Sequence, residues 1–228
     1  MDYIAPDDTY GLRIGALASI YSVAHSPLVK EKHPILSQST RSIASIQVQN
    51  RGTLAGNICN AVPSADSAPA LLCLGAKVAS MSPRGERQID IEEFFAGPNK
   101  TVLEADELVK EIRIPDQPEG TRGVYIKLSP RSRMDLAVVG VAVMARKADE
   151  TVPDIRIGLG AVAPRPIRAF TAEETLRGVR ISDDAILEAS KRASEESAPI
   201  DDHRASAEYR RMMVEVLVDR ALRQTLAG

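Results

Sequence analysis

The first seventy-five residues follow mostly helical hydrophobic patterns. A short apolar run at 12–16 predicts a strand. Over 19–29 and again over 33–46, apolar residues recur every three or four positions, the spacing that lines one face of a helix. Residues 67–74 predict a further helix, and Gly75 closes it because glycine tolerates the left-handed conformation common just past a helix end.

The pattern then changes to strands. Runs at 77–81 and 87–91 flank a Pro-Arg-Gly turn at 83–85 and predict a hairpin. Residues 107–115 alternate apolar and charged side chains, which predicts a half-buried strand. The proline- and glycine-containing segment 116–120 comes next and is the best linker in the chain.

Beyond the linker the chain predicts a small sheet followed by helices. Three strand-like runs occupy residues 122–128, 137–145 and 154–162. Thr171 and Glu174 have the spacing of a capping box at the start of a helix, and Ser182 is the expected N-cap of the next one. The last helix is expected from about residue 204, with one apolar face formed by Tyr209, Met213, Leu217 and Ala221. The prediction is an α+β protein with two lobes.

Residues 47–69 have a different composition, because Gly, Asn, Ser, Asp and Pro crowd together there. We expect a long ordered loop, and such loops in compact domains are usually functional. Small residues such as Gly56 let backbone amides approach an anion, while Thr53 and Asn57 add side-chain hydrogen-bonding groups. Asp66, just before the helix at 67–74, either holds the hydroxyls of a ribose or simply caps that helix.

Composition narrows the class of protein. The 228 residues include 29 Lys and Arg against 31 Asp and Glu, so the formal net charge is -2. A near-neutral chain is not expected to be a dedicated nucleic-acid binder, which uses basic side chains to neutralise phosphates. No run approaches the ~18 apolar residues of a membrane span, and the acidic, proline-containing start is unlike a signal peptide. With Cys59 and Cys73 as the two cysteines, we expect a cytoplasmic protein.

The sequence does not predict a metal site or a dinucleotide-binding motif of the Gly-x-Gly type. The three histidines and two cysteines lack the spacing of metal ligands. Gly158-Leu159-Gly160 superficially fits a dinucleotide fingerprint, but Pro164 and Pro166 prevent the helix that this motif requires. We expect instead a strand end packed closely against a neighbour. The cluster of Lys127, Arg131 and Arg133 around Asp135 is either a solvated turn or a contact for an anion or partner.

Several segments, in order, resemble the FAD subunits of molybdenum hydroxylases, the family of the xanthine dehydrogenase and aerobic carbon monoxide dehydrogenase medium subunits. The most specific segment runs from Gln49 to Leu72 and contains Thr53-Leu54-Ala55-Gly56-Asn57 and Ser64-Ala65-Asp66. Further matches are Gly15-Ala16, Phe94-Phe95-Ala96-Gly97, Glu111-Ile112-Arg113-Ile114-Pro115, Lys127 to Ala137, Gly158 to Pro166, and Asp201 to Arg211. The resemblance covers essentially the whole chain.

The resemblance implies an α+β fold with a partial PCMH-type FAD-binding lobe at 1–117, followed at 121–228 by a C-terminal domain with a three-stranded antiparallel sheet and helices. It also implies that FAD is the cofactor and that Thr53, Gly56 and Asn57 hold its pyrophosphate. Asp66 would hold the ribose end, and Leu108 or Val109 and Lys127 would contact the cofactor from the next lobe face. The protein would position the flavin, which performs the redox chemistry.

The implied partners are a small subunit with two iron–sulfur clusters and a large molybdopterin subunit, from which electrons reach the flavin and then an acceptor. Two departures from the family pattern stand out. Ala55 replaces the usual first glycine of a pair, which would narrow the approach to the phosphate. The chain also lacks the Gly-Gly loop of an N-terminal FAD lobe. Either another chain supplies that lobe, or the chain is a shortened form, or FAD is bound weakly or not at all. The alternative is a cofactor-free structural subunit that bridges the two partners.

Overall fold

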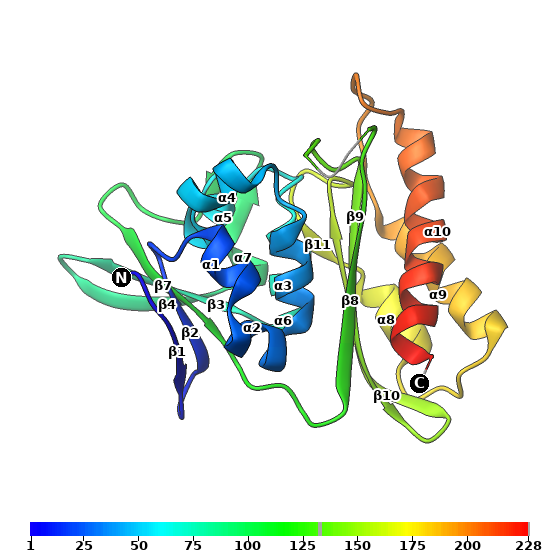
Figure 1. The fold of residues 1–228 in the computed structure, drawn as a ribbon. Helices are drawn as coiled ribbons and strands as arrows, with labels where there is room; N and C mark the ends of the chain where they lie inside the picture. Colours follow the sequence, from blue (N-terminus) through cyan, green and yellow to red (C-terminus); the bar gives the residue numbers. More distant parts are fainter. Residues whose placement is uncertain (132–133, 228) are drawn as a thin grey trace.

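Four layers of secondary structure alternate across the molecule (Figure 1). A five-stranded sheet, a layer of helices, a four-stranded sheet and a second layer of helices follow one another. The computed structural model describes residues 1–131 and 134–227. Each sheet therefore buries one face against the central helices, and the second sheet buries both faces.

The first sheet is antiparallel, with the strand order β1-β2-β7-β3-β4. Its strands are β1 (Ile4–Asp7), β2 (Gly11–Gly15), β3 (Lys77–Ser82), β4 (Gly85–Asp90) and β7 (Leu108–Ile114). The predicted strand at 12–16, the hairpin and the strand at 107–115 are confirmed. Gly75 adopts a φ of 62° after the preceding helix, as expected for a glycine cap. The edge strand β1 was missed, because its Pro6 and Asp7 mask the strand pattern.

Helices and two very short strands complete the first lobe. They are α1 (Ile20–His25), α2 (Pro27–Lys32), α3 (Pro34–Arg41), α4 (Ile46–Arg51), α5 (Leu54–Cys59), α6 (Ser67–Leu74), α7 (Ile91–Phe94), β5 (Phe95–Gly97) and β6 (Lys100–Thr101). The prediction of one helix over 19–29 is wrong. Pro27 cannot donate the amide hydrogen bond of a helix interior, so Ser26 ends α1 and caps α2 instead.

The prediction of one long loop over 47–69 is also wrong, since α4 and α5 lie within it. Each helix begins at a side-chain cap: Ser45 Oγ accepts from the Val48 amide, and Thr53 Oγ1 accepts from the Gly56 amide. Such caps satisfy amides that have no partner inside the helix. The polar residues that indicated a loop therefore act as helix caps.

The second sheet has the strand order β11-β10-β9-β8. Its strands are β8 (Thr121–Leu128), β9 (Val139–Ala148), β10 (Thr151–Gly160) and β11 (Ile167–Arg168). The three predicted strands are present, but a three-stranded sheet is wrong, because β11 pairs with β10 through Gly158 and Leu159. Strand β11 has only two residues, between Pro166 and the helix that begins at Phe170, so it is too short to show the alternating pattern that predicts a strand.

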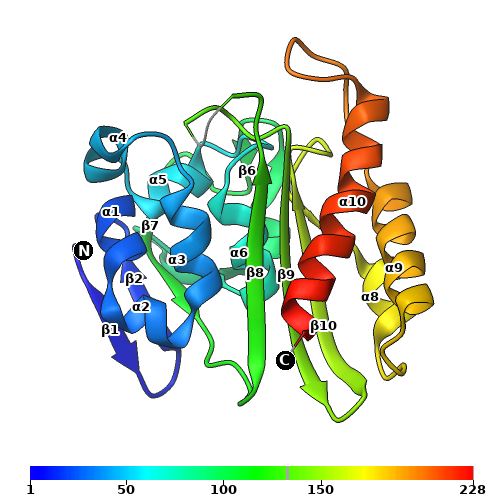
Figure 2. The ribbon, with the colours of Figure 1, turned by 45° about the vertical axis from the view of Figure 1, so that its right-hand side comes forward.

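The outer helices are α8 (Phe170–Leu176), α9 (Asp183–Glu196) and α10 (Ala207–Leu226), all on one face of the second sheet (Figure 2). Ser182 caps α9 as predicted, by accepting from the Ala185 amide. The capping box at Thr171 is wrong, because α8 already begins at Phe170 and has no side-chain cap. On α10, Leu217 and Ala221 are buried as expected, whereas Tyr209 is 41% exposed.

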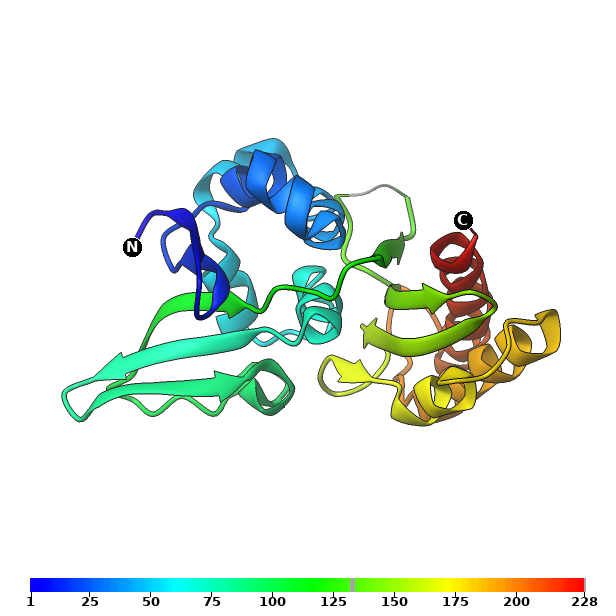
Figure 3. The ribbon, with the colours of Figure 1, turned by 90° about the horizontal axis from the view of Figure 1, so that it is seen from below.

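Helix α6 lies between the two sheets and joins the lobes (Figure 3). All eight of its residues are buried, and its side chains share one core with strands of both sheets. Gly158 faces it so closely that a Cβ there would lie 2.4 Å from the carbonyl oxygen of Pro69. A Cβ at Gly160 would lie 2.9 Å from the Pro69 ring. The predicted close packing of this strand end is confirmed.

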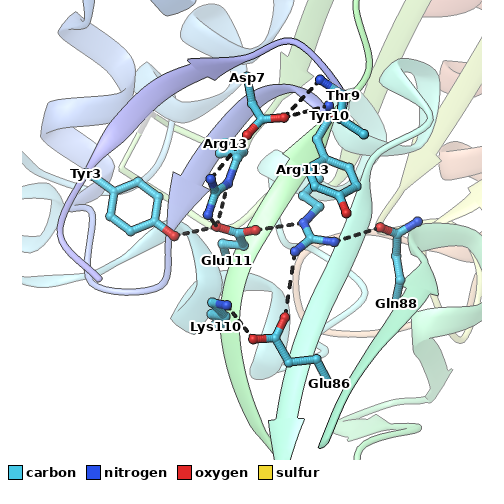
Figure 4. A network of polar contacts seen from close by, with 10 residues as sticks. All are labelled: Tyr3, Asp7, Thr9, Tyr10, Arg13, Glu86, Gln88, Lys110, Glu111 and Arg113. Carbon is cyan, nitrogen blue, oxygen red and sulfur yellow. Dashed lines mark hydrogen bonds and ion pairs between the residues drawn. The ribbon is translucent and has the colours of Figure 1, made fainter.

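On the face of the first sheet that points away from the helices, a buried carboxylate organises a polar layer (Figure 4). Glu111 is fully buried and accepts from Arg13 Nε at 2.9 Å, from Arg113 Nε at 2.7 Å and from the Tyr3 hydroxyl. Burial raises the pKa of Glu111, but these hydrogen bonds outweigh it and lower the pKa to about 2. The network ties β2 and β7 to Tyr3, which directly precedes β1.

Candidate functional site

Thr53, Gly56 and Asn57 lie together at the start of α5, as the resemblance implies. The Gly56 amide donates to Thr53 Oγ1 at 2.9 Å, so this amide already has an acceptor within the chain. A Cβ at Gly56 would lie 3.0 Å from the same oxygen, which is a tight contact. Glycine at 56 therefore leaves room for the Thr53 cap.

The backbone amide of Ala55 belongs to the first turn of α5, between Thr53 and Gly56. Its neighbour Leu54 donates its amide to Ala18 O at 3.3 Å, whereas the Ala55 amide has no acceptor in the described part of the chain. The Ala55 methyl group is buried in the core of the first lobe. The alanine side chain at this position therefore packs into the core, and the narrowed approach to the phosphate stays a prediction.

Asn57 connects α5 to the start of α6. Its Oδ1 accepts from the Ser67 hydroxyl at 2.6 Å. Ser67 is fully buried and directly follows Asp66. The Asn57 side chain thus braces the two helix ends against each other and places α5 beside the buried carboxylate.

The Asp66 carboxylate lies at the junction of the two lobes and is only 6% exposed. Its Oδ1 accepts from the Tyr125 hydroxyl at 2.7 Å, and its Oδ2 accepts from Lys127 Nζ at 2.8 Å. Lys127 also donates to Ser42 O at 2.9 Å. Asp66 makes no capping hydrogen bond to α6, so the simple N-cap alternative is wrong.

The electrostatics of this cluster reflect its burial. Loss of water raises the pKa of Asp66, while the Lys127 ammonium and the Tyr125 hydroxyl oppose that rise. Burial, together with the adjacent Asp66 carboxylate, raises the pKa of Tyr125 well above its usual range. The tyrosine is therefore a neutral donor, and the cluster is an ion pair with one additional hydrogen bond.

Leu108 and Val109 lie at the end of β7 nearest to α5. The Ala16 amide donates to Lys110 O at 3.0 Å, and Ser19 pairs with Thr53, so this sheet end adjoins the start of α5. Val109 packs against the core, whereas Leu108 is 67% exposed. The cross-strand neighbour of Leu108, Met81, is also exposed. An apolar sheet end thus lies next to the polar helix start.

Sequence reasoning missed Tyr125, Ser42 and Ser67. A usable signal existed for Tyr125, because residues two apart on a strand point to the same face and Lys127 was already a candidate. Ser42 contributes a backbone carbonyl, which no side-chain pattern reveals.

The basic cluster divides in the structure. Arg131 pairs with Asp135 at 3.1 Å and is 85% exposed, while Lys127 points into the lobe junction. Arg133 lies outside the described residues. Within 1–131 and 134–227, no group of His, Cys, Asp and Glu side chains is arranged to hold a metal ion. No helix in the same residues has the length and apolar character needed to cross a membrane.

Two α+β lobes that share the helix α6, with a buried ion pair at their junction, define a two-domain α+β subunit. Residues 1–117 match the model of the FAD binding domain in molybdopterin dehydrogenase, and residues 124–225 match that of the CO dehydrogenase flavoprotein C-terminal domain. The chain belongs to this family of molybdenum hydroxylase flavoprotein subunits, and the expected family and fold are confirmed.

Relatives and solved structures agree with this assignment. The glyceraldehyde dehydrogenase medium chain of Sulfolobus acidocaldarius is 34% identical over 94% of this chain and 75% of its own length. The carbon monoxide dehydrogenase medium chain of Hydrogenophaga pseudoflava is 35% identical over 92% of this chain and 72% of its own. A structure of carbon monoxide dehydrogenase from that organism matches with a TM-score of 0.95 and 35% identity, covering 99% of this chain and 78% of the matched one.

Proposed function

We propose that this chain is the FAD-binding medium subunit of a molybdenum hydroxylase and acts as an oxidoreductase component that relays electrons. The family match over both lobes is the observation that carries the proposal. FAD, when bound, accepts electrons from iron–sulfur clusters and passes them to an acceptor. The chain itself supplies the binding groups, their orientation and the surrounding charge.

The groups at the lobe junction fit an extended nucleotide cofactor. An amide without an acceptor at Ala55 and the Thr53 hydroxyl lie at the start of α5, and the exposed side chain of Leu108 lies on β7, a strand that α5 contacts. Lys127 contributes a cation from the second lobe. The chain thus presents both polar groups for a diphosphate and an apolar side chain for a ring system, which is the combination a flavin nucleotide needs.

We assign roles on this basis. Thr53, Gly56 and Asn57 would shape the helix start that faces the diphosphate, and Leu108 or Val109 would contact the cofactor from the sheet end. Asp66 would hold the ribose end, and Lys127 would place a positive charge near the bound anion. The Asp66–Lys127 pair makes this charge arrangement dependent on both lobes.

The assembly and its location follow from the same proposal. An iron–sulfur small subunit and a molybdopterin large subunit are the partners, and we divide this chain into an FAD-binding lobe at 1–117 and a C-terminal domain at 121–228. We place the complex in the cytoplasm, because both Cys59 and Cys73 are unpaired.

Flavin content tests the proposal. We expect the purified complex to be yellow and to release FAD on denaturation in a 1:1 ratio to this chain. The double variant Asp66→Asn/Lys127→Met removes the buried pair while keeping similar side-chain volumes, and we expect it to lose flavin. The matched control is Lys32→Met/Asp116→Asn, which removes an exposed pair at 3.0 Å and should keep its flavin.

Two other results would contradict parts of this proposal. A colourless chain inside an otherwise active complex would support the cofactor-free structural subunit instead. Full flavin content in Asp66→Asn/Lys127→Met would contradict the roles given to those two residues and leave the family function intact.

A further inference from the structure

Tyr125 joins the Asp66–Lys127 ion pair by donating a hydrogen bond to the Asp66 carboxylate. Tyr125 and Lys127 are two residues apart on β8 and therefore point to the same side of the second sheet. Both reach across the lobe junction to the two oxygens of the Asp66 carboxylate, at 2.7 Å and 2.8 Å. The carboxylate is thus held at two points by one strand.

The two donors differ in how firmly they orient the carboxylate. A lysine ammonium is a point charge on a flexible stem, and Lys127 also donates to Ser42 O. The tyrosine ring is rigid and 9% exposed, and its backbone amide donates to Gln38 Oε1 at 3.0 Å. The Tyr125 hydroxyl, on its rigid ring, therefore holds Asp66 Oδ1, while the Lys127 ammonium holds Oδ2.

Gly140 on the neighbouring strand β9 makes room for that hydroxyl. A Cβ at Gly140 would lie 2.9 Å from the Tyr125 hydroxyl oxygen and 3.6 Å from the nearest ring carbons. The close approach thus involves only the hydroxyl. Any side chain at 140 would displace the atom that holds Asp66.

We propose that Tyr125 is a positioning residue for the flavin site, which orients the Asp66 carboxylate so that Asp66 and Lys127 present one arrangement to the cofactor. This inference rests on the proposed function, because it takes Asp66 and Lys127 to be cofactor-binding residues. Tyr125 acts through Asp66 and does not itself need to touch the flavin.

The test uses the purified complex, which is depleted of flavin, titrated with FAD and followed by flavin fluorescence. Tyr125→Phe removes one buried hydrogen bond to a charged group, and we expect FAD affinity to fall about tenfold. The control is Tyr10→Phe, the same chemical change at a ring that lies on Arg113 outside the site. FAD affinity in this control should stay within about twofold of the wild type.

A double-mutant cycle separates positioning from a general structural effect. If Tyr125 acts through Asp66, Tyr125→Phe should cost no further affinity in an Asp66→Asn background. Gly140→Ala should weaken FAD binding by displacing the hydroxyl, and Tyr125→Phe should relieve the clash, because the remaining contacts at 3.6 Å are ordinary.

The outcomes are distinguishable. If the wild type binds FAD and Tyr125→Phe binds it with the same affinity, the role of Tyr125 is overturned and the proposed function is not. The same holds if Tyr125→Phe causes its full loss of affinity in the Asp66→Asn background. A wild-type complex that binds no FAD would overturn the proposed function and, with it, this inference. The thermal stability of each flavin-free variant, measured in parallel, shows whether a loss of affinity reflects unfolding.

Discussion

The contact between Gly158 and α6 yields a sharp prediction about how the lobes are joined. Gly158→Ala would place a methyl group 2.4 Å from the Pro69 carbonyl oxygen and 3.0 Å from its carbonyl carbon. Both atoms belong to the backbone of a fully buried helix, so they cannot rotate out of the way as a side chain would. Either α6 or β10 must shift.

Overpacking of this kind costs about 1–3 kcal/mol of unfolding free energy, and the backbone contact places Gly158→Ala in the upper part of that range. For a chain of this size, 1 kcal/mol corresponds to roughly 2–4 °C in melting temperature. We therefore expect Gly158→Ala to lower the melting temperature by roughly 5–10 °C.

Thermal unfolding of the purified protein, followed by circular dichroism, measures the effect. Gly97→Ala is the matched control, because a Cβ at Gly97 meets no atom within 4 Å. Its unfolding free energy should stay within about 0.5 kcal/mol of the wild type. Equal melting temperatures for Gly158→Ala and the wild type would refute the idea that this contact sets the spacing of the lobes.

Three further predictions concern polar side chains. His33 is 1% exposed, neither ring nitrogen has a hydrogen-bond partner among the residues that the structure describes, and burial lowers its pKa to about 4. Between pH 6.5, the ordinary pKa of histidine, and about pH 4, the unfolded chain binds a proton that the folded chain does not. The free energy of unfolding should therefore decrease as the pH is lowered through this range, by at most about 3 kcal/mol. His33→Leu should reduce the difference between the unfolding free energies measured by urea denaturation at pH 7 and at pH 5. An unchanged difference would contradict this role of His33. Lys127→Met leaves the Asp66 carboxylate buried without its cation and should cost about 3–5 kcal/mol in urea unfolding, with Asp66→Asn recovering most of the loss. Thr53→Ala should cost about 1 kcal/mol through loss of the α5 cap, whereas Thr53→Ser should retain the wild-type midpoint.

Local patterns predicted much of the fold. The hairpin around residues 83–85, the glycine cap at Gly75 and the three long strands of the second sheet all depend on side chains close in sequence. The same is true of the Ser182 cap, which accepts from an amide three residues away. Prolines at 164 and 166 likewise excluded a dinucleotide fingerprint, because proline removes the amides that a helix start needs.

Interactions between distant residues decided the rest. The polar residues at 47–69 are equally compatible with a loop and with capped helices. Burial of Leu54 and Ile58 selects the helix α5, and the buried Gln49, which donates to Arg41 O and Ile43 O, ties α4 to the first lobe. Asp66 had two local interpretations, whereas its actual partners lie 59 and 61 residues further along the chain. Residue types and short-range spacing thus specify the elements and nominate candidate groups. Which buried polar group pairs with which depends on desolvation and donor geometry, and these arise only once the two lobes have packed together.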